Sequence, residues 1–382
     1  MSKKPQIHPL LDAEKQNQAR QYEKEKRILG LIGSGISLVF LLTFYYSGFS
    51  YRLANLNDQS VLRTFIIYIF VFQTLATIVG LPLTYIQSYI HEHRWNFSNY
   101  THKTWALDQL KSFLVSLILM PLLIGLLYWV MARYPDYWWL IAGLGIAVVG
   151  VIFATLFPVL ILPIFNKYDP IDDEELTSRL TQILQKAGLK PGGFFKQDMS
   201  RQTKKENAFL AGLGKTRRVV LADNLLDNMT VPEIESVIAH EVGHYRHAHI
   251  WKNIALGTIQ QLIVFWILDW FMRANFPHFL ESVRWNLTLF PILALTMGFI
   301  SGFLFGPLNL TLSRFFERQA DRIALELIPG PAAFKSAMAG LANRNLSNAY
   351  PSRWIKWLYY SHPPIGERLA FAESFESAST SK

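Results

Sequence analysis

The 382-residue sequence contains no cysteine. This absence excludes disulfide bonds, thiolate metal ligands and a cysteine nucleophile. Any metal ion must therefore be held by histidine, aspartate or glutamate. A cleavable signal peptide is also not expected, because residues 1–27 are polar and of mixed charge, and the apolar run behind them is long enough to span a bilayer.

Charged residues are scarce. They make up 17% of the chain, whereas 51% of the residues are hydrophobic and the mean hydropathy is +0.18. This composition is too apolar for an ordinary soluble domain and too charged for a pure membrane bundle, so it indicates a membrane protein with a substantial polar part. The net charge of +9 does not indicate nucleic-acid binding, because no basic stripe is interleaved with aromatic residues outside the loops.

Charge-free apolar runs predict six membrane-spanning helices, since about 20 helical residues cross a bilayer core. The runs are 28–51, 64–90, 112–131, 137–166, 253–268 and 285–313. The fifth run is short and ends at Asp269, so we expect its helix to begin inside the preceding histidine-rich segment. The stretch 50–61 leaves no room for a further crossing. We therefore predict a mainly α-helical, polytopic membrane bundle.

An even number of spans places both chain ends on one side of the membrane, and the positive-inside rule identifies that side. Lysine and arginine are concentrated in residues 1–27, 91–111 and 166–252, whereas the opposite loops hold few. The basic segments all fall on the face expected to be cytoplasmic. The predicted regions are a cytoplasmic N-terminal segment (1–27), a transmembrane region of four spans (28–165), and a region 166–382 with two further spans near 250–270 and 286–312.

The polar segment 166–236 is predicted to combine helices and short strands. Residues 169–190 have acidic residues near their start and a glycine near their end, which is typical of a helix. Two stretches, 192–199 and 215–226, favour short strands on either side of a loop at 204–214. The next helix is predicted to begin at Thr230, which can form a capping box with Glu233.

That helix carries the motif H-E-x-x-H at 240–244. His240 and His244 lie one helical turn apart on the same face and can share a metal ion. Glu241 lies beside that face, where it can take a proton from a metal-bound water but cannot easily bind the same ion. The alternative is a cluster of histidines at a membrane interface. That interpretation gives no reason to place a glutamate between them at a lipid boundary.

A catalytic zinc ion needs a third protein ligand. Glu317 and Asp321 lie four residues apart just after the sixth span, so they share one face of a helix. A metal bound by Glu317 and a histidine N–H bound by Asp321 would give both acids a partner. The alternative is a solvated helix face with ion pairs from Glu317 to Arg314 or Arg318.

Downstream histidines are weaker candidates for the third ligand. The arrangement H-E-x-x-H-x-x-G-x-x-H is excluded, because Ile250 occupies its last position and His247 its glycine position. His249 is nine residues from His240 and therefore points to the opposite face of a straight helix. We expect His247 and His249 to be solvated histidines at the interface.

Several motifs together resemble the type I CAAX prenyl endopeptidases, which are integral-membrane zinc metalloproteases. The matching stretches are "GLPLTYIQSYIHEHRWNFSN" (80–99), "LPIFNKYDPI" (162–171), "NAFLAGLGKTRRVVLADNLL" (207–226), "HEVGHYRHAH" (240–249), "SRFFERQAD" (313–321) and "WLYYSHPPIGERL" (357–369). Their order and spacing also match, and the resemblance covers most of the chain after about residue 60.

The resemblance implies a role for each matching position. The ligands of one zinc ion (Zn2+) per chain would be His240, His244 and Glu317. Glu241 would be the general base, and Asp321 an acid behind the ligands that is sometimes described as a proton donor. The substrate backbone would bind as an added strand along Asn207, Ala208 and Phe209. His362 would stabilise the oxyanion of the tetrahedral intermediate, although "SHPP" by itself indicates only a rigid turn.

The resemblance further implies a zincin-type (gluzincin) α+β domain on the cytoplasmic side, with peptide or protein substrates that it meets at the lipid bilayer. Well-known eukaryotic members have seven spans around a water-filled chamber, whereas this sequence predicts six. A long charged insertion before the H-E-x-x-H helix is also absent, which is typical of a compact bacterial homologue. The bacterial inner membrane is then the expected location, or the endoplasmic reticulum membrane in a eukaryote. Bacteria generally do not prenylate proteins, so the motifs alone do not transfer a prenylated substrate.

The sequence leaves three functions open. The first is a zinc metalloendopeptidase that acts on membrane-associated or C-terminally lipidated, CAAX-like proteins. The second is a quality-control protease that degrades misfolded membrane proteins. The third is a six-span transporter or metal-binding scaffold without catalysis, in which Gln73, Gln260 and Gln261 line a path. Against the third, no predicted span carries an internal charge of the kind that marks ion pathways.

Overall fold

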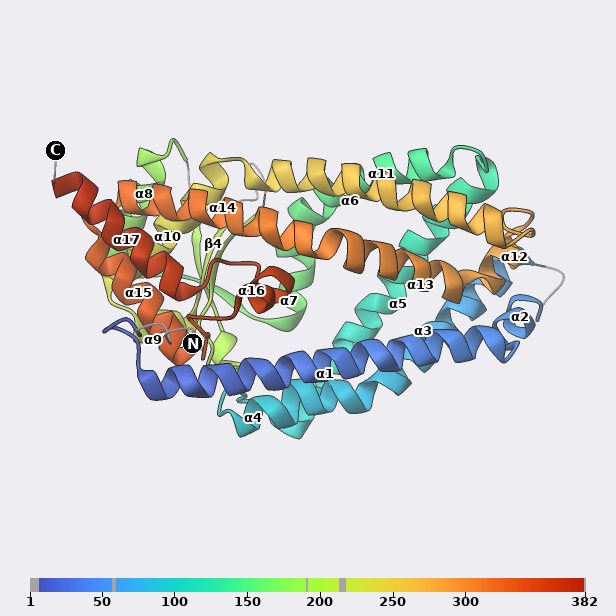
Figure 1. Cartoon of the computed structure of the whole chain (residues 1–382), viewed down its shortest axis with the longest axis horizontal. Helices are drawn as coiled ribbons and strands as arrows, with labels where there is room; N and C mark the ends of the chain where they lie inside the picture. Colours follow the sequence, from blue (N-terminus) through green and yellow to red (C-terminus); the bar gives the residue numbers. More distant parts are fainter. Residues whose placement is uncertain (1–6, 57–59, 190–191, 213–217, 381–382) are drawn as a thin grey trace.

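The computed structural model describes residues 7–56, 60–189, 192–212 and 218–380. Long helices run side by side along the long axis of the molecule, and the first helix starts at the same end where the last helix finishes (Figure 1). Within these described ranges, six helical segments are long and apolar enough to cross a membrane. The six predicted spans are therefore confirmed, and their even number accounts for the shared location of the two ends.

Several of the six spans contain a short π-helical stretch. The spans are α1 (Ala13–Tyr46), α3 (Val61–Tyr85) with η1 (Ile86–His91) and α4 (Glu92–Arg94), α5 (His102–Arg133), α6 (Trp138–Leu156) with η2 (Phe157–Ile161) and α7 (Leu162–Phe165), α11 (His249–Asn275), and α13 (Phe290–Phe299) with η5 (Ile300–Phe305) and α14 (Gly306–Leu327). Two six-residue helices, α2 (Phe49–Ala54) and α12 (Val283–Thr288), lie at the far end of the bundle (Figure 1). Each is only about 9 Å long, which is too short for a crossing.

The fifth span begins inside the histidine-rich segment, as expected, but as a separate helix, and it ends later than the sequence suggested. The histidine-rich segment forms two helices, α10 (Val231–Arg246) and α11, because Ala248 has a left-handed backbone with a φ of 55°. α11 then continues past Asp269, which the sequence suggested as its end. The Asp269 carboxylate accepts a hydrogen bond from Trp138 Nε1 at 2.6 Å and one from Arg273 Nε at 2.9 Å. A carboxylate that accepts two hydrogen bonds can lie inside a membrane-spanning helix.

A four-stranded sheet lies beside α10, with the strand order β1–β2–β4–β3. β2 (Phe194–Gln197) and β4 (Arg218–Ala222) confirm the two predicted strands. β3 (Ala208–Ala211) lies in the stretch that we expected to be a loop, and the three-residue β1 (Tyr168–Pro170) is too short to leave a strand pattern in the sequence. β3 pairs antiparallel with β4 and ends the sheet, so no strand of the described residues pairs with its other edge, which we call the free edge.

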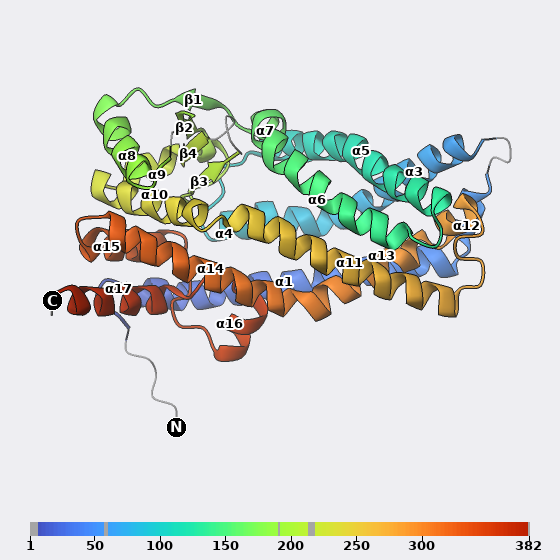
Figure 2. The same ribbon diagram turned by 90° about the horizontal axis from the view of Figure 1, so that it is seen from above.

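The remaining helices gather with the sheet at the end of the molecule opposite α2 and α12 (Figure 2). They are α8 (Glu174–Lys186), the 3-10 helix η3 (Met199–Arg201), α9 (Asp223–Asn228), α15 (Pro331–Arg344), α16 (Arg353–Tyr359) and α17 (Ile365–Thr380). Their core includes Leu180, Leu221, Ile238 and Phe334, all fully buried. A separate core around Tyr68, Trp138, Met272 and Leu287 holds the spans together at the far end. The end of the molecule that holds the sheet therefore has a hydrophobic core of its own.

Candidate active site

α10 brings the H-E-x-x-H motif against α14. The helix begins at the predicted capping box, where the Glu233 carboxylate accepts the Thr230 N–H at 2.8 Å. Three turns later, Gly243 meets α14 so closely that a Cβ atom built on it would lie 2.6 Å from the Cα of Ala320. Only a glycine permits this backbone contact. The crossing places His240 and His244 opposite Glu317, which lies one turn before Ala320.

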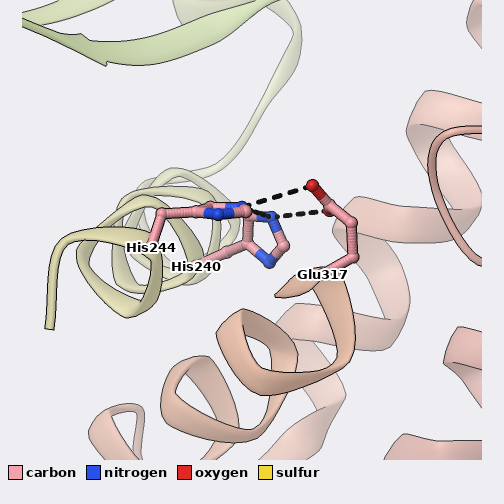
Figure 3. A group of neighbouring side chains, drawn as sticks. All are labelled: His240, His244 and Glu317. Atoms are coloured by element: carbon pink, nitrogen blue, oxygen red, sulfur yellow. Dashed lines mark hydrogen bonds and ion pairs between the residues drawn. The ribbon is translucent and has the colours of Figure 1, made fainter. Parts of the chain in front are cut away.

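The side chains of His240, His244 and Glu317 converge on one point (Figure 3). The two Nε2 atoms of the histidines lie 3.2 Å apart. Glu317 Oε2 is 3.2 Å from His240 Nε2, and Glu317 Oε1 is 3.3 Å from His244 Nε2. One potential ligand atom from each residue lies within 4.8 Å of the other two, so a single metal ion can reach all three.

Glu317 does not make the ion pairs that a solvated helix face would give it. Arg314 donates instead to the backbone oxygens of Lys356 and Tyr360, and Arg318 pairs with Glu367. Glu317 itself is buried, and among the described residues its Oε2 atom has no hydrogen-bond partner. A buried carboxylate oxygen without a donor costs free energy, and a metal cation would satisfy it. The donor set therefore fits a divalent metal ion.

His240 is oriented by a buried acid. Its Nδ1–H donates to Asp321 Oδ1 at 2.8 Å, which leaves Nε2 with its lone pair toward Glu317 and His244. Burial alone would lower the pKa of His240, but the carboxylates of Asp321 and Glu317, at 2.8 Å and 3.2 Å from its two ring nitrogens, outweigh burial and raise the pKa to about 9. Surroundings that favour a protonated imidazole this strongly also favour a metal cation in the same place.

His249 corrects our expectation of a solvated interfacial histidine. It is only 2% exposed, because the break at Ala248 turns it back toward His244. Its Nε2–H donates to Gln319 Oε1 at 3.0 Å, so its Nδ1 accepts from His244 Nδ1–H at 2.9 Å. This series of hydrogen bonds fixes the tautomer of His244 and directs its Nε2 lone pair at the proposed metal position. A straight helix, as the sequence suggested, would have pointed His249 away.

Arg368 is the second site residue without a role in our sequence analysis. It is buried, and its guanidinium donates to both oxygens of Asp321, from Nη2 to Oδ1 at 2.5 Å and from Nε to Oδ2 at 2.9 Å. The residue lies in the stretch "SHPPIGER", which was singled out for His362. Its spacing from Asp321 in the sequence gave no sign of the pairing. Arg368 holds Asp321 so that one oxygen still accepts the proton of His240.

Glu241 faces both the histidines and the free edge of β3. Burial raises the pKa of its carboxyl group, the nearby His240 and His244 lower it, and the backbone N–H of Leu210 on β3 donates to it. Because of that hydrogen bond, the Glu241 carboxylate lies between the three candidate metal ligands and β3. Asn207 immediately precedes β3, and Ala208 and Phe209 are its first two residues. A peptide that pairs with this edge would have its backbone next to Glu241.

His362 reaches the cluster from the segment between α16 and α17. Its Nε2 lies 3.3 Å from Glu317 Oε1, and its Nδ1 is 2.8 Å from the Ser361 hydroxyl. The side chain is 58% exposed. It lines a cleft of about 880 Å³ together with Asn207, Ala208, His240 and Glu241. Five of the predicted site residues line this cleft, and His244, Glu317 and Asp321 contact His240 at its wall.

Comparisons with known proteins agree with this arrangement. Residues 170–376 match the peptidase family M48, and residues 2–167 match the region described as "CAAX prenyl protease N-terminal, five membrane helices". Only four of the six candidate spans lie within residues 2–167, one fewer than that description gives.

Similar proteins include bacterial and eukaryotic ones. The "Uncharacterized metalloprotease YhfN" of Bacillus subtilis is 29% identical and aligns with 94% of this chain and 86% of its own length. "CAAX prenyl protease 1" of Saccharomyces cerevisiae is 26% identical, with 96% and 87% covered. The crystal structure of S. mikatae Ste24p superposes with a TM-score of 0.83 at 23% identity, over 97% of this chain and 91% of that one. The last match establishes the fold.

Proposed function

This chain belongs to peptidase family M48, and from that premise we propose that it is a zinc metalloendopeptidase of membrane-associated or C-terminally lipidated proteins. It is a multi-pass membrane protein and a metalloprotease by family. The observation that supports the proposed mechanism is the position of Glu241, between the three-ligand cluster and the free edge of β3. Two histidines and one glutamate are a ligand set typical of catalytic zinc.

The proposed metal ligands are His240, His244 and Glu317. A bound zinc ion supplies Lewis acidity, which lowers the pKa of a water ligand and polarises the substrate carbonyl. Asp321 and Arg368 keep His240 in the tautomer that presents Nε2, and His249 does the same for His244. These residues hold the ligands in place.

Glu241 acts as the general base and later as the acid. Its carboxylate takes a proton from the attacking water and passes it to the nitrogen of the departing amine. The raised pKa of its half-buried carboxyl group suits a residue that must both accept and release a proton. His362 Nε2, on the exposed side of the cluster, donates to the oxyanion that forms on the substrate carbonyl.

The substrate backbone binds along the free edge of β3, at Asn207, Ala208 and Phe209. An extended peptide adds there as a further strand, and its main-chain groups pair with the unpaired groups of β3. This pairing requires no particular side chains. It therefore suits either a processing protease or one that degrades misfolded membrane proteins, which is the second candidate function.

The relatives named CAAX prenyl protease 1 favour lipidated C-terminal substrates, and the charge bias of the loops favours a cytoplasmic active site. The test compares a farnesylated C-terminal peptide, the same peptide without the lipid, and an unfolded membrane protein, each incubated with the purified enzyme in detergent. Preferential cleavage of the farnesylated peptide supports the first function, and preferential cleavage of the unfolded protein supports quality control. A transporter or scaffold would cleave none of the three.

A further inference from the structure

The first membrane helix borders a second cavity, on the side opposite the active-site cleft. This cavity is a groove of about 820 Å³ between α1 and α3, lined mainly by apolar side chains, and we call it the α1–α3 groove. Ser34 of α1 lines the cleft, whereas Ile36 and Thr43 line the groove. At about 100° per residue, these two residues lie within about 20° of the side of α1 opposite Ser34. The groove therefore opens on the outer surface of the bundle.

The walls of the groove require an apolar occupant. On the inner side, Phe40 and Phe44 of α1 contact Phe72 of α3, with 5.5 and 5.2 Å between the ring centroids. On the open side, Val39 is 64% exposed and Ile32 is 47% exposed. Both helices belong to membrane spans, so the open side faces the hydrocarbon of the bilayer, where no water is available to fill it. An acyl chain or an apolar helix can fill it.

One end of the groove carries a cation. Arg52 of α2 lines it there and is the one charged side chain among the described lining residues. Its Nη2 donates to the backbone oxygen of Ser47 at 3.3 Å, and no carboxylate of the described residues forms an ion pair with it. One turn before Ser47, the hydroxyl of Thr43 has no hydrogen-bond partner within the described part of the chain. Arg52 and Thr43 therefore keep donors for a ligand.

The dimensions of the groove suit a lipid chain better than a helix. Its lining residues on α1 run from Ile32 to Ser47, which is about 23 Å along the helix at about 1.5 Å per residue. Divided by that length, the volume of about 820 Å³ gives a mean cross-section of about 36 Å². A helix about 10 Å across needs roughly 80 Å². A second helix would therefore not enter the groove, whereas an extended acyl chain can lie in it.

The position of Arg52 matches the head group of the same lipid. α2 lies at the end of the bundle opposite the catalytic end (Figure 1), where the spans reach the membrane surface. Half the hydrocarbon core is about 15 Å thick, so the chain of a lipid in this leaflet fits within the length of the groove. The guanidinium group is a planar fork of donors that matches a phosphate. Thr43, one turn deeper than Ser47, can donate to an ester oxygen.

We propose that the α1–α3 groove is a binding site for one phospholipid of the leaflet on the side of α2. An acyl chain lies along α1 in the groove, and the phosphate accepts hydrogen bonds from Arg52. The site is separate from the active-site cleft, and the inference does not depend on the proposed peptidase function. The bound lipid fills the gap between two spans and gives an unpaired cation its counterion, so it stabilises the folded chain.

The test measures how four probes bind to the full chain purified in detergent. They are phosphatidylglycerol, phosphatidylcholine, a diacylglycerol with the same acyl chains, and inorganic phosphate. Native mass spectrometry gives the affinity of the tightest-bound lipid on each chain, and the thermal midpoint reports the stabilisation. Both phospholipids carry the phosphate, so each is expected to bind about tenfold more tightly than the diacylglycerol, which lacks the charge-assisted contact with Arg52. Inorganic phosphate alone is not expected to bind.

Two variants remove the two halves of the site. Arg52→Gln is expected to bind both phospholipids about tenfold more weakly, as weakly as the diacylglycerol. Its control is Arg63→Gln, because Arg63 is an exposed arginine in the first turn of α3 and does not line the groove. Gly35→Leu fills the groove and is expected to abolish binding of the phospholipids and the diacylglycerol. A Cβ atom at Gly35 meets no atom within 4 Å, so the variant should fold; Gly145→Leu on α6, equally open, is its control.

Equal affinity of wild type and Arg52→Gln for the phospholipids would overturn the site, as would tight lipid binding by Gly35→Leu. A wild-type dimer in light scattering that dissociates in Gly35→Leu would also overturn it, since a helix of a second copy would then cover the groove. Binding of inorganic phosphate as tight as that of the phospholipids would show that the groove takes no acyl chain. None of these measurements requires peptide cleavage, so their outcome is independent of the proposed peptidase function.

Discussion

Replacing Gly243 with alanine adds one methyl group where α10 and α14 cross. The new Cβ atom would lie 2.6 Å from the Cα of Ala320, 2.8 Å from its carbonyl oxygen and 3.1 Å from its carbonyl carbon. All three are backbone atoms, so no side chain can rotate away. Carbon atoms pack at about 3.5–4.0 Å. The two helices must therefore separate by about 1 Å at this point.

The expected cost to stability is small, whereas the expected cost to function is large. Overpacking of this kind costs about 1–3 kcal/mol of unfolding free energy, and the better helix propensity of alanine returns about 1 kcal/mol. However, the shift moves His240 and His244 away from Glu317 on the other helix. A misplacement of about 1 Å in a catalytic site can cost about 100-fold in rate. We expect Gly243→Ala to lose zinc affinity and about 100-fold in kcat/KM while it still folds.

The assay measures kcat/KM, zinc content and the thermal midpoint of the same detergent-purified samples. The control is Gly257→Ala on α11, since a Cβ atom at Gly257 meets no atom within 4 Å. It is expected to keep full activity. Ala320→Gly should not rescue Gly243→Ala, because the clash involves only backbone atoms of residue 320. Wild-type zinc affinity and kcat/KM in Gly243→Ala would refute the argument that this crossing sets the ligand geometry.

Four further outcomes are expected. His249→Phe should weaken zinc binding about 10- to 100-fold in a chelator competition, whereas the control His247→Phe should not. Equal effects of the two substitutions would contradict the role of His249 as the partner of His244. Arg368→Lys keeps the positive charge but should lower kcat, because lysine cannot donate to both oxygens of Asp321. An unchanged kcat would contradict the role of Arg368 in holding Asp321. Burial raises the pKa of Glu233, but hydrogen bonds from Ser336 and Thr230 outweigh it and lower the pKa below the usual value. The contribution of Glu233 to stability is therefore present above its unfolded-state pKa and lost as the pH falls through its folded-state pKa. Glu233→Gln should lower the thermal midpoint more at neutral pH than at acidic pH. An equal loss at both pH values would exclude this linkage. A single cysteine placed at Lys24 should react with an impermeant maleimide only from the cytoplasmic face; reaction from the other face alone would reverse the proposed orientation.

The features that the sequence predicted well are those encoded by local patterns. Runs without charge predicted all six spans, and the capping box predicted the start of α10. The spacing of four residues within each pair predicted that His240 and His244 share one face and that Glu317 and Asp321 share another. Helical periodicity fixes such relations without any knowledge of the tertiary structure. The zinc and the individual catalytic roles remain predictions.

The features that the sequence did not predict depend on contacts between distant segments or on single backbone angles. Arg368 reaches Asp321 across 47 residues, and Lys205 reaches Tyr22 across 183. The left-handed backbone at Ala248, an unusual conformation for alanine, reverses the direction in which His249 points. β3 has only four residues and is a strand because β4 pairs with it, not because of its own composition.

The central claim is that this chain is a zinc peptidase with Glu241 as its base, and the most direct test compares wild type with Glu241→Ala. Zinc content and peptide cleavage are measured side by side on both proteins in detergent. The variant keeps His240, His244 and Glu317, so we expect zinc in both proteins and cleavage by wild type alone. Zinc in neither protein, or cleavage that persists in the variant, would contradict it.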